Sequence, residues 1–322
     1  MTNPAASETR LKTNQHSRFS EWLNAMPHPS VVLEIAATHV AAARWGRDIS
    51  HLAASAVEKL PEGAIVPSAT QANINDAAAV RAAIRRVVSR VPSQGQPVAL
   101  MVPDPVIRVF ILSFDSFPRR AEEALPMLRW RLKKSLPFDA EEAAISWMKQ
   151  SNRGGKPEIV ATIARQRIIR EYESAAEEEG ISVGVVQSST LATLPMLDRE
   201  LTTLLVRMSD RNLTTVITSG DTLCVYRSTE MDRTQGHVSS QSILDEVFPA
   251  IAFYQDTWGG KVERVKVAGF GEIEGELIEA LAREVSCSSQ PLSVTTHLPA
   301  EATSLAAKGL EALVGWQMNL GG

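Results

Sequence analysis

The segment VVLEIAATHVAAARWGRDISHLAASAV (31–57) is the stretch of sequence that decides the fold class. It holds the apolar runs VVLEIAA (31–37), HVAAARW (39–45) and HLAASAV (51–57), with short breaks between them. Short apolar runs bounded by turn-forming residues are typical of β-strands joined by tight turns. The segment therefore predicts three consecutive strands at the start of a β-rich domain.

A helix and a buried strand follow this segment. Apolar side chains recur at helical spacing from Asp76 to Val91, with Asn75 or Asp76 as the N-cap, and PVALMVP (97–103) predicts a buried strand. The same order of elements returns later in the chain. Its members are the strands LLVRM (204–208), LTTVITS (213–219) and TLCVYRS (222–228), a helix over 242–258 and the strand VERVKVAG (262–269). The chain is therefore an architectural repeat of two βββαβ halves.

The remaining patterns complete a domain plan. Elements in the order β-α-β-β-α-β, from VIRVFILSF (106–114) to ISVGVVQ (181–187), predict a small helix-on-sheet module inserted in the first half. A helix over 272–285, a strand LSVTTH (292–297) and a last helix over 303–316 end the second half. The plan is a flexible leader at 1–28, a first lobe at 29–104 to which 185–200 returns, an inserted module at 105–184 and a second lobe at 201–322.

Three longer segments resemble the PilM family of type IV pilus assembly proteins. They are ALPMLRWRLKKSLPFDAEEAAISW (124–147), SILDEVFPAIAFYQDTWGGKVERVKVAGFG (242–271) and LAAKGLEAL (305–313). Their order and spacing together carry the resemblance, which covers roughly residues 29–316. It implies an α/β protein of the actin-like ATPase superfamily, related to FtsA. The implied fold is the actin-like (ribonuclease H-like) one, a duplicated βββαβ arrangement with an inserted small α+β module.

The resemblance also implies a function. PilM-like proteins lie in the cytoplasm against the inner membrane and bind the short cytoplasmic tail of the membrane protein PilN. The resemblance thus implies a cytoplasmic scaffold of pilus assembly with a PilN-like partner. Contact with the membrane would be peripheral and through partners, and homo-oligomerisation stays open. Two alternatives remain, namely an active actin-fold ATPase or kinase-like enzyme, and a cytoplasmic component of a type II secretion system.

Several PilM-like proteins bind ATP between their lobes, which requires glycine-rich hairpin turns for the phosphates and a strand-end carboxylate for hydrated Mg²⁺. If this chain retains such a site, the resemblance implies that its members are Glu34, Thr38, Ser209, Asp210, Gly269 and Gly271. However, Ala36 and Ala37 occupy the first turn without glycine, and Arg207 reverses the charge expected at the second strand end. The sequence therefore predicts a pseudo-ATPase, with ATP and Mg²⁺ bound weakly or not at all and with no catalytic residue.

Composition argues against several other classes of protein. Lys and Arg number 33 against 37 Asp and Glu, giving a net charge of −4, whereas proteins dedicated to nucleic acid are usually basic. The two cysteines and six histidines show none of the spacings of a metal site. No uncharged run matches the roughly 20 apolar residues that a membrane span needs. We therefore expect no nucleic-acid partner, no metal and no transmembrane segment.

Two further surfaces carry open alternatives. Basic residues cluster on two predicted helices, at Arg81, Arg85, Arg86 and Arg90 and at Arg129, Arg131, Lys133 and Lys134. Each cluster is either a solvated face balanced by carboxylates or a surface that faces anionic lipid or an acidic partner. The strands PVIRVFILSF (105–114) and EIVATIA (158–164) are either the walls of a peptide groove, where a strand can add to a sheet edge, or plain core.

Overall fold

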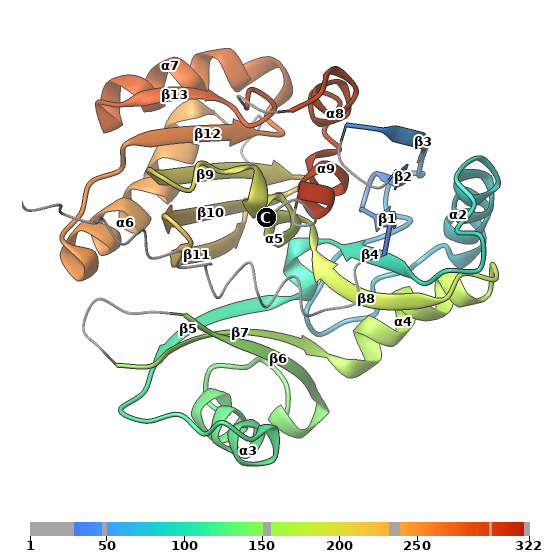
Figure 1. Ribbon diagram of the computed structural model, residues 1–322, viewed down its shortest axis with the longest axis horizontal. Coiled ribbons are helices and arrows are strands. Elements are labelled where there is room, and N and C mark those ends of the chain that lie inside the picture. The colour runs from blue at the N-terminus through green and yellow to red at the C-terminus, as the bar shows by residue number, and fades with distance from the viewer. Residues whose placement is uncertain (1–28, 47–49, 151–155, 232–238, 296–297, 319–322) are drawn as a thin grey trace, which may run out of the picture.

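The computed structural model describes residues 29–46, 50–150, 156–231, 239–295 and 298–318. The predicted leader at 1–28 lies outside the described residues. Two five-stranded sheets form two lobes, and a three-stranded sheet forms a separate module beside them (Figure 1). This arrangement confirms the predicted α/β fold with a duplicated βββαβ unit and a small inserted module.

The first lobe is built on a sheet with the strand order β3-β2-β1-β4-β8. Its strands are β1 (Val31–Ile35), β2 (His39–Trp45), β3 (Leu52–Lys59), β4 (Val98–Val102) and β8 (Val183–Ser188). β1, β2 and β3 form the predicted antiparallel meander, and β4 pairs in parallel with β1. Helix α2 (Ala77–Arg90) packs on this sheet through Val80, Ile84 and Val87, and Asp76 caps its start by accepting from the N–H of Ala79.

The second lobe repeats this plan with the strand order β11-β10-β9-β12-β13. Its strands are β9 (Thr202–Ser209), β10 (Asn212–Ser219), β11 (Thr222–Glu230), β12 (Arg264–Ala268) and β13 (Ser288–Pro291). The crossover helices are α6 (Ser240–Trp258) and α7 (Glu274–Val285). Antiparallel pairing joins β9, β10 and β11, and parallel pairing joins β9, β12 and β13. The two lobes therefore share one topology, as the order of apolar runs predicted.

The inserted module has a sheet with the order β5-β7-β6, covered by one helix. Its elements are β5 (Arg108–Ser113), α3 (Ala121–Leu132), β6 (Ala143–Gln150) and β7 (Glu158–Arg165). Leu128 and Leu132 of α3 pack on Ile159 and Ile163 of the central strand β7. This small core is separate from the cores of the two lobes.

The membership of two elements differs from the domain plan. Helix α4 (Gln166–Glu177) and strand β8 fall in the range 105–184 expected for the module, but both pack in the first lobe. Ile168 and Tyr172 of α4 are buried in the core that α2 also covers, and β8 pairs in parallel with β4. The apolar pattern of a strand does not specify its partner. We therefore propose that the module ends at Arg165.

The end of the chain differs from its prediction in two places. The edge strand of the second lobe is β13, not the expected 292–297, because the register with β12 selects the polar run Ser288–Pro291. The expected helix over 303–316 is two helices, α8 (Ala300–Ala306) and α9 (Glu311–Met318). Gly309 has a φ of +80° between them, a left-handed conformation that ends α8.

A short helix between the lobes had no signal in the sequence. α5 (Ser189–Thr193) follows β8, and all five of its residues are buried. It packs against α9 in the middle of the molecule (Figure 1). The surrounding core joins the two sheets, since it includes Val32 and Ala99 of the first lobe and Leu205 and Val216 of the second. The lobes are therefore held together by shared apolar packing.

Candidate functional site

A cleft of about 920 Å³ lies where the two lobes and the inserted module meet. The first lobe contributes the β1–β2 turn and the loop 60–70, and the second contributes the β9–β10 turn and β11. The module contributes β5 through Arg108, Val109 and Phe110. The larger aliphatic and phenyl side chains of the lining are those of Leu60, Ile65, Val66, Ile107, Val109 and Phe110. One wall is therefore apolar, and the two hairpin turns supply polar groups.

Three of the predicted site residues line this cleft together. Thr38 comes from the β1–β2 turn, and Ser209 and Asp210 come from the β9–β10 turn. The hydroxyl of Thr38 lies 3.1 Å from Nδ1 of His39, and Asp210 has a φ of +54°. The repeat brings equivalent turns of the two lobes to one edge of the cleft. The other three, Glu34, Gly269 and Gly271, do not line it.

Gly269 has a packing role at the end of β12. Its φ is +85°, and a Cβ atom at this position would lie 2.0 Å from the carbonyl oxygen of Met208. Only glycine permits this approach of β12 to the end of β9. Gly271 also has a positive φ, of +56°, but a Cβ there would meet nothing within 4 Å. The close approach at Gly269 is to the protein's own backbone.

Glu34 is buried beneath the β1–β2 turn, with 2% of its surface exposed. Its Oε1 accepts a hydrogen bond of 2.7 Å from the hydroxyl of Ser189 on α5. Its Oε2 lies 3.8 Å from Nε2 of His39. Burial alone would raise the pKa of Glu34, but His39, Arg207 and Ser189 together hold it below the ordinary value. The carboxylate is therefore kept ionised by groups of the protein itself.

Arg207 places a buried cation at the end of β9. Only 5% of the residue is exposed, and Nη1 donates to the hydroxyl of Thr190 at 3.2 Å. Nη1 lies 3.8 Å from Oδ2 of Asp104, and Nη2 lies 3.9 Å from Oε2 of Glu311. Burial would lower the pKa of Arg207, but the carboxylates of Glu311, Asp104 and Glu34 outweigh it and raise the pKa. The guanidinium is therefore charged, and carboxylates of the protein itself balance its charge.

Asp104 joins the two lobes directly. It follows β4 of the first lobe and accepts from the backbone N–H of Thr190 at 2.9 Å and from the Thr190 hydroxyl. It also accepts a hydrogen bond of 2.8 Å from the hydroxyl of Thr214 on β10 of the second lobe. We call Glu34, Asp104, Arg207 and Glu311 the interlobe ion cluster. Burial raises the pKa of Glu311 despite the attraction of Arg207.

The residues of this cluster do not fit a magnesium nucleotide. Hydrated Mg²⁺ needs carboxylate oxygens that face the phosphates. Here the guanidinium of Arg207 lies within 3.9 Å of Asp104 and Glu311, and Oε1 of Glu34 accepts a hydrogen bond from Ser189. Within the described ranges, no group of three His, Cys, Asp or Glu side chains is arranged to hold a metal ion. Sequence analysis identified Arg207 and Glu34 but missed Asp104 and Glu311.

A close helix contact in the core between the two sheets is the crossing of α5 and α9. A Cβ atom at Gly315 of α9 would lie 2.2 Å from the carbonyl oxygen of Ala192 and 2.8 Å from Cα of Thr193. The two helices therefore touch backbone to backbone. Because a side chain at Gly315 would separate the helices, this glycine sets the distance between α5 and α9, which packs on β1 and β2 of the first lobe.

The module is also attached to both lobes. The side-chain amide of Gln150 donates to the carbonyl oxygen of Leu223 at 2.8 Å and accepts from its N–H at 3.1 Å. This pair continues the hydrogen-bonding pattern of β11 with a side chain of β6. On the other side, Arg165 donates to the carbonyl oxygen of Thr70 at 3.0 Å. The walls of the cleft are therefore held in place from both ends of the module.

Only one of the two strands predicted to form the walls of a peptide groove lines the cleft. β5 lines the cleft and is an edge strand of the module, as β11 is of the second lobe. Strand β7, from the predicted 158–164 run, pairs on both sides, with β5 and β6, and does not line the cleft. Its apolar character is explained by Ile159, Ala161 and Ile163 in the module core. Of the two predicted walls, only β5 lines the cleft.

The first basic cluster is balanced within the protein. On α2, Arg81 pairs with Glu178 and Arg85 with Glu179 at 2.8 Å. Arg86 and Arg90 both pair with Glu58, at 2.9 and 2.8 Å. This cluster is therefore a solvated face balanced by carboxylates, which was one of the two expected alternatives.

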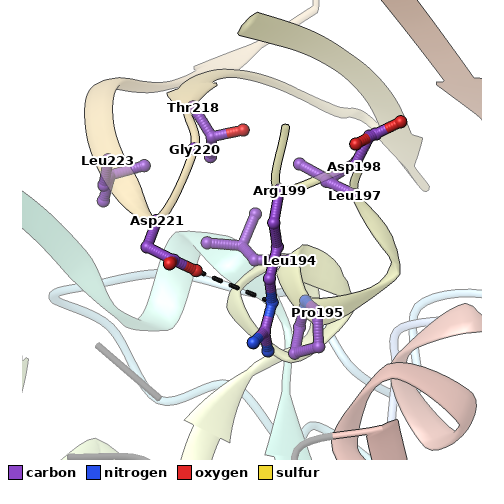
Figure 2. Close-up of a pocket in the computed structure, with 9 residues that line it drawn as sticks. All are labelled: Leu194, Pro195, Leu197, Asp198, Arg199, Thr218, Gly220, Asp221 and Leu223. Atoms are coloured by element: carbon purple, nitrogen blue, oxygen red, sulfur yellow. Dashed lines mark ion pairs between the residues drawn. The ribbon is translucent and has the colours of Figure 1, made fainter. Parts of the chain in front are cut away.

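A second, smaller pocket lies at the connection between the lobes (Figure 2). It has a volume of about 30 Å³ and lies between Leu194–Arg199 and the β10–β11 turn. Arg199 and Asp221 of its lining form the ion pair drawn as a dashed line in Figure 2. Nε of Arg199 lies 3.6 Å from Oδ1 of Asp221. This volume is close to that of one water molecule. The pocket is too small for a ligand, and the cleft of about 920 Å³ is the candidate site.

None of the helices within the described ranges has the length and apolar character needed to cross a membrane. No protein-family model and no curated protein sequence matches the chain. Solved structures do match it. A PilM–PilN type IV pilus biogenesis complex aligns with a TM-score of 0.69 at 15% identity, over 91% of this chain and 98% of that one.

Two other matches are more distant. The cytoplasmic domain of EpsL, an inner-membrane component of the type II secretion system of Vibrio cholerae, has a TM-score of 0.48 at 12% identity and covers 83% of this chain and 98% of that one. MreB 5 of Spiroplasma citri bound to AMPPNP has a TM-score of 0.38 at 11% identity, over 89% and 93% of the two chains. The chain therefore has the actin-like ATPase fold and is similar in structure to PilM over most of its length.

Proposed function

We propose that this protein is a cytoplasmic adaptor of type IV pilus assembly that binds the short tail of a PilN-like inner-membrane protein in the cleft. The observation that carries the proposal is the cleft of about 920 Å³ between two edge strands, β5 and β11. Ligand pockets typically have volumes of about 300–1,000 Å³, so the cleft has room for a short peptide segment. The protein would lie at the membrane through this partner.

The chemistry of the walls supports a peptide ligand. An edge strand presents backbone N–H and C=O groups that an added strand can pair with, while apolar pockets accept alternate side chains. β5 supplies the edge, and Val66, Ile65 and Phe110 supply the apolar contacts. The attachment of the module through Gln150 and Arg165 keeps these walls in place without a ligand. A preformed groove lowers the entropy lost on binding.

The interlobe ion cluster supports a scaffold that works without nucleotide turnover. Arg207 already neutralises the buried carboxylates, which is the electrostatic role that a metal ion would otherwise take. The protein is then a pseudo-ATPase. We expect millimolar ATP with Mg²⁺ to change the melting temperature by less than about 1 °C, because a ligand stabilises only by RT ln(1 + [L]/Kd). A shift of about 5 °C or more, which corresponds to micromolar affinity in a chain of this size, would contradict this part of the proposal.

Binding of the tail is tested with fluorescently labelled peptides from the cytoplasmic ends of membrane proteins encoded beside this one. Val66→Asp puts a charge on the apolar wall, and we expect at least a tenfold loss of affinity, since an unpaired charge in an apolar contact costs at least about 1.4 kcal/mol. Val57→Asp is the matched control, because Val57 is 49% exposed against 52% for Val66 but lies on β3 outside the cleft. Equal loss in both variants, or no binding of any tail, would refute the adaptor function. Tails from secretion proteins in the same assay test the type II secretion alternative.

A further inference from the structure

The second basic cluster differs from the first, because it has few internal partners. On α3, Arg129 lies 3.4 Å from Glu141. Among the described residues, no carboxylate lies within 4.0 Å of Arg131, Lys133 or Lys134. By contrast, every arginine of the α2 cluster has such a partner. The positive charge at the end of α3 is therefore available to something outside the described chain.

A tryptophan lies in the middle of these cations. Trp130 is 79% exposed, whereas the other exposed large apolar side chains range from 49% to 55%. The buried side of α3 is formed by Ala124, Leu128 and Leu132, so Trp130 points away from the module core. We call Trp130, Arg131, Lys133 and Lys134 the α3 patch. An indole held in water on a rigid helix, next to unpaired cations, is a ready contact for an anionic and partly apolar surface.

We propose that the α3 patch binds an anionic lipid bilayer directly. Tryptophan prefers the interface between water and hydrocarbon, and lysine and arginine beside it attract acidic headgroups. The patch is on the helix of the module that lies outside its small sheet, away from both lobes (Figure 1). The acidic pair Glu122 and Glu123 lies in the first turn of α3, so the helix would touch the bilayer with its C-terminal half.

Because the protein as a whole is negatively charged, it can bind an anionic membrane only through a locally positive surface. At −4 overall, the chain is repelled by an anionic membrane unless one surface is turned toward it. Each lysine or arginine close to such a membrane increases partitioning by about fivefold. Three cations acting together would therefore contribute about a hundredfold, before the indole is counted. Binding of this kind weakens with salt, because screening shortens the reach of the charges.

The test is co-sedimentation with vesicles of phosphatidylcholine alone and of phosphatidylcholine mixed with phosphatidylglycerol. We expect the protein to bind the mixed vesicles and not the neutral ones. Reversing Lys133 and Lys134 to Glu removes two attractive charges and adds two repulsive ones, so partitioning should fall by at least about tenfold. Lys261→Glu with Lys308→Glu is the matched control, since it makes the same charge change at two exposed positions away from α3.

The contribution of the indole has its own pair of variants. Trp130→Ala should lower partitioning by about fivefold or more, whereas Phe253→Ala, which removes a 55% exposed ring from α6, should leave it unchanged. Unchanged melting temperatures show that the variants are folded. The proposal is refuted if the protein ignores the mixed vesicles, or if the control variants lose as much binding as the patch variants. Recognition of an acidic protein by the patch without vesicle binding would also refute it. None of these results affects peptide binding in the cleft.

Discussion

Replacing Arg207 by Met tests whether the charge of Arg207 balances the buried carboxylates of the interlobe ion cluster. Methionine keeps most of the side-chain volume and removes the charge. Two carboxylates, of Asp104 and Glu311, lie 3.8 and 3.9 Å from the guanidinium. At these distances each pair is worth about 4 kcal/mol at an effective dielectric constant of about 20, before desolvation is subtracted. Removing one partner of a buried ion pair typically costs about 3–5 kcal/mol, which is our expected loss in the free energy of unfolding at pH 8.

The pH dependence of this loss separates the electrostatic explanation from simple loss of packing. Burial already raises the pKa of Glu311 above its unfolded value of 4.5, and losing Arg207 raises it further. A carboxyl whose folded pKa is raised binds more protons when folded, so its stability is present at low pH and is lost as the pH rises through the folded pKa. The loss in the variant should therefore become smaller as the pH falls from 8 toward the unfolded pKa of 4.5, and it should be measurably smaller at pH 5 than at pH 8.

Urea unfolding followed by tryptophan fluorescence measures both quantities. Glu311→Gln is the control, because it removes the carboxylate that burial disfavours while it keeps the shape. We expect it to destabilise the protein less than Arg207→Met does, because Arg207 keeps Asp104 and Glu34. If Arg207→Met loses less than about 1 kcal/mol at pH 8, or the same amount at pH 8 and pH 5, the carboxylates do not depend on Arg207 for their charge balance and the reasoning is wrong.

Two other contacts give sharp predictions. Gly315→Ala would place its Cβ 2.2 Å from the carbonyl oxygen of Ala192, so we expect a loss of at least about 1–3 kcal/mol in urea unfolding. Gly275→Ala, on the exposed side of α7 with nothing within 4 Å of the new Cβ, should instead be neutral or stabilising by up to about 1 kcal/mol. Gln150→Leu leaves the N–H and C=O of Leu223 without their side-chain partner. Amide exchange at Leu223 should then become at least about fivefold faster, because one lost hydrogen bond is worth about 1 kcal/mol; an unchanged rate would show that the module is not attached there.

Local patterns were enough to predict most elements of both lobes. The meander of β1, β2 and β3 and its repeat in β9, β10 and β11 follow from short apolar runs and tight turns, and both depend on neighbours in the chain. The cap at Asp76 follows for the same reason. The partners of β8 and β13 could not be predicted, because parallel pairing joins residues far apart, such as Leu100 with Val186. The polar composition of β13 also left it without a signal.

Some features of the candidate site could likewise be predicted from the sequence, and others could not. The absence of glycine at Ala36 and Ala37 and the charge reversal at Arg207 are visible in the sequence alone. Asp210 lies near Arg207 in the sequence, but the carboxylates that face Arg207 are those of Asp104 and Glu311. A weak signal existed for Asp104, since it follows a buried strand directly and lies between two prolines. Glu311 had none, because the break before α9 was not predicted.

The sequence by itself determined that the chain is a duplicated α/β protein whose β1–β2 and β9–β10 turns lack glycine. Those properties depend on which residues are neighbours along the backbone. Only the tertiary structure decided that carboxylates neutralise Arg207 and that Gly315 lets α9 touch the backbone of α5. It also decided that the arginines of α2 are paired with carboxylates, whereas most cations at the end of α3 are not. Each of these depends on distances between side chains remote in sequence, which form only when the sheets and helices pack together.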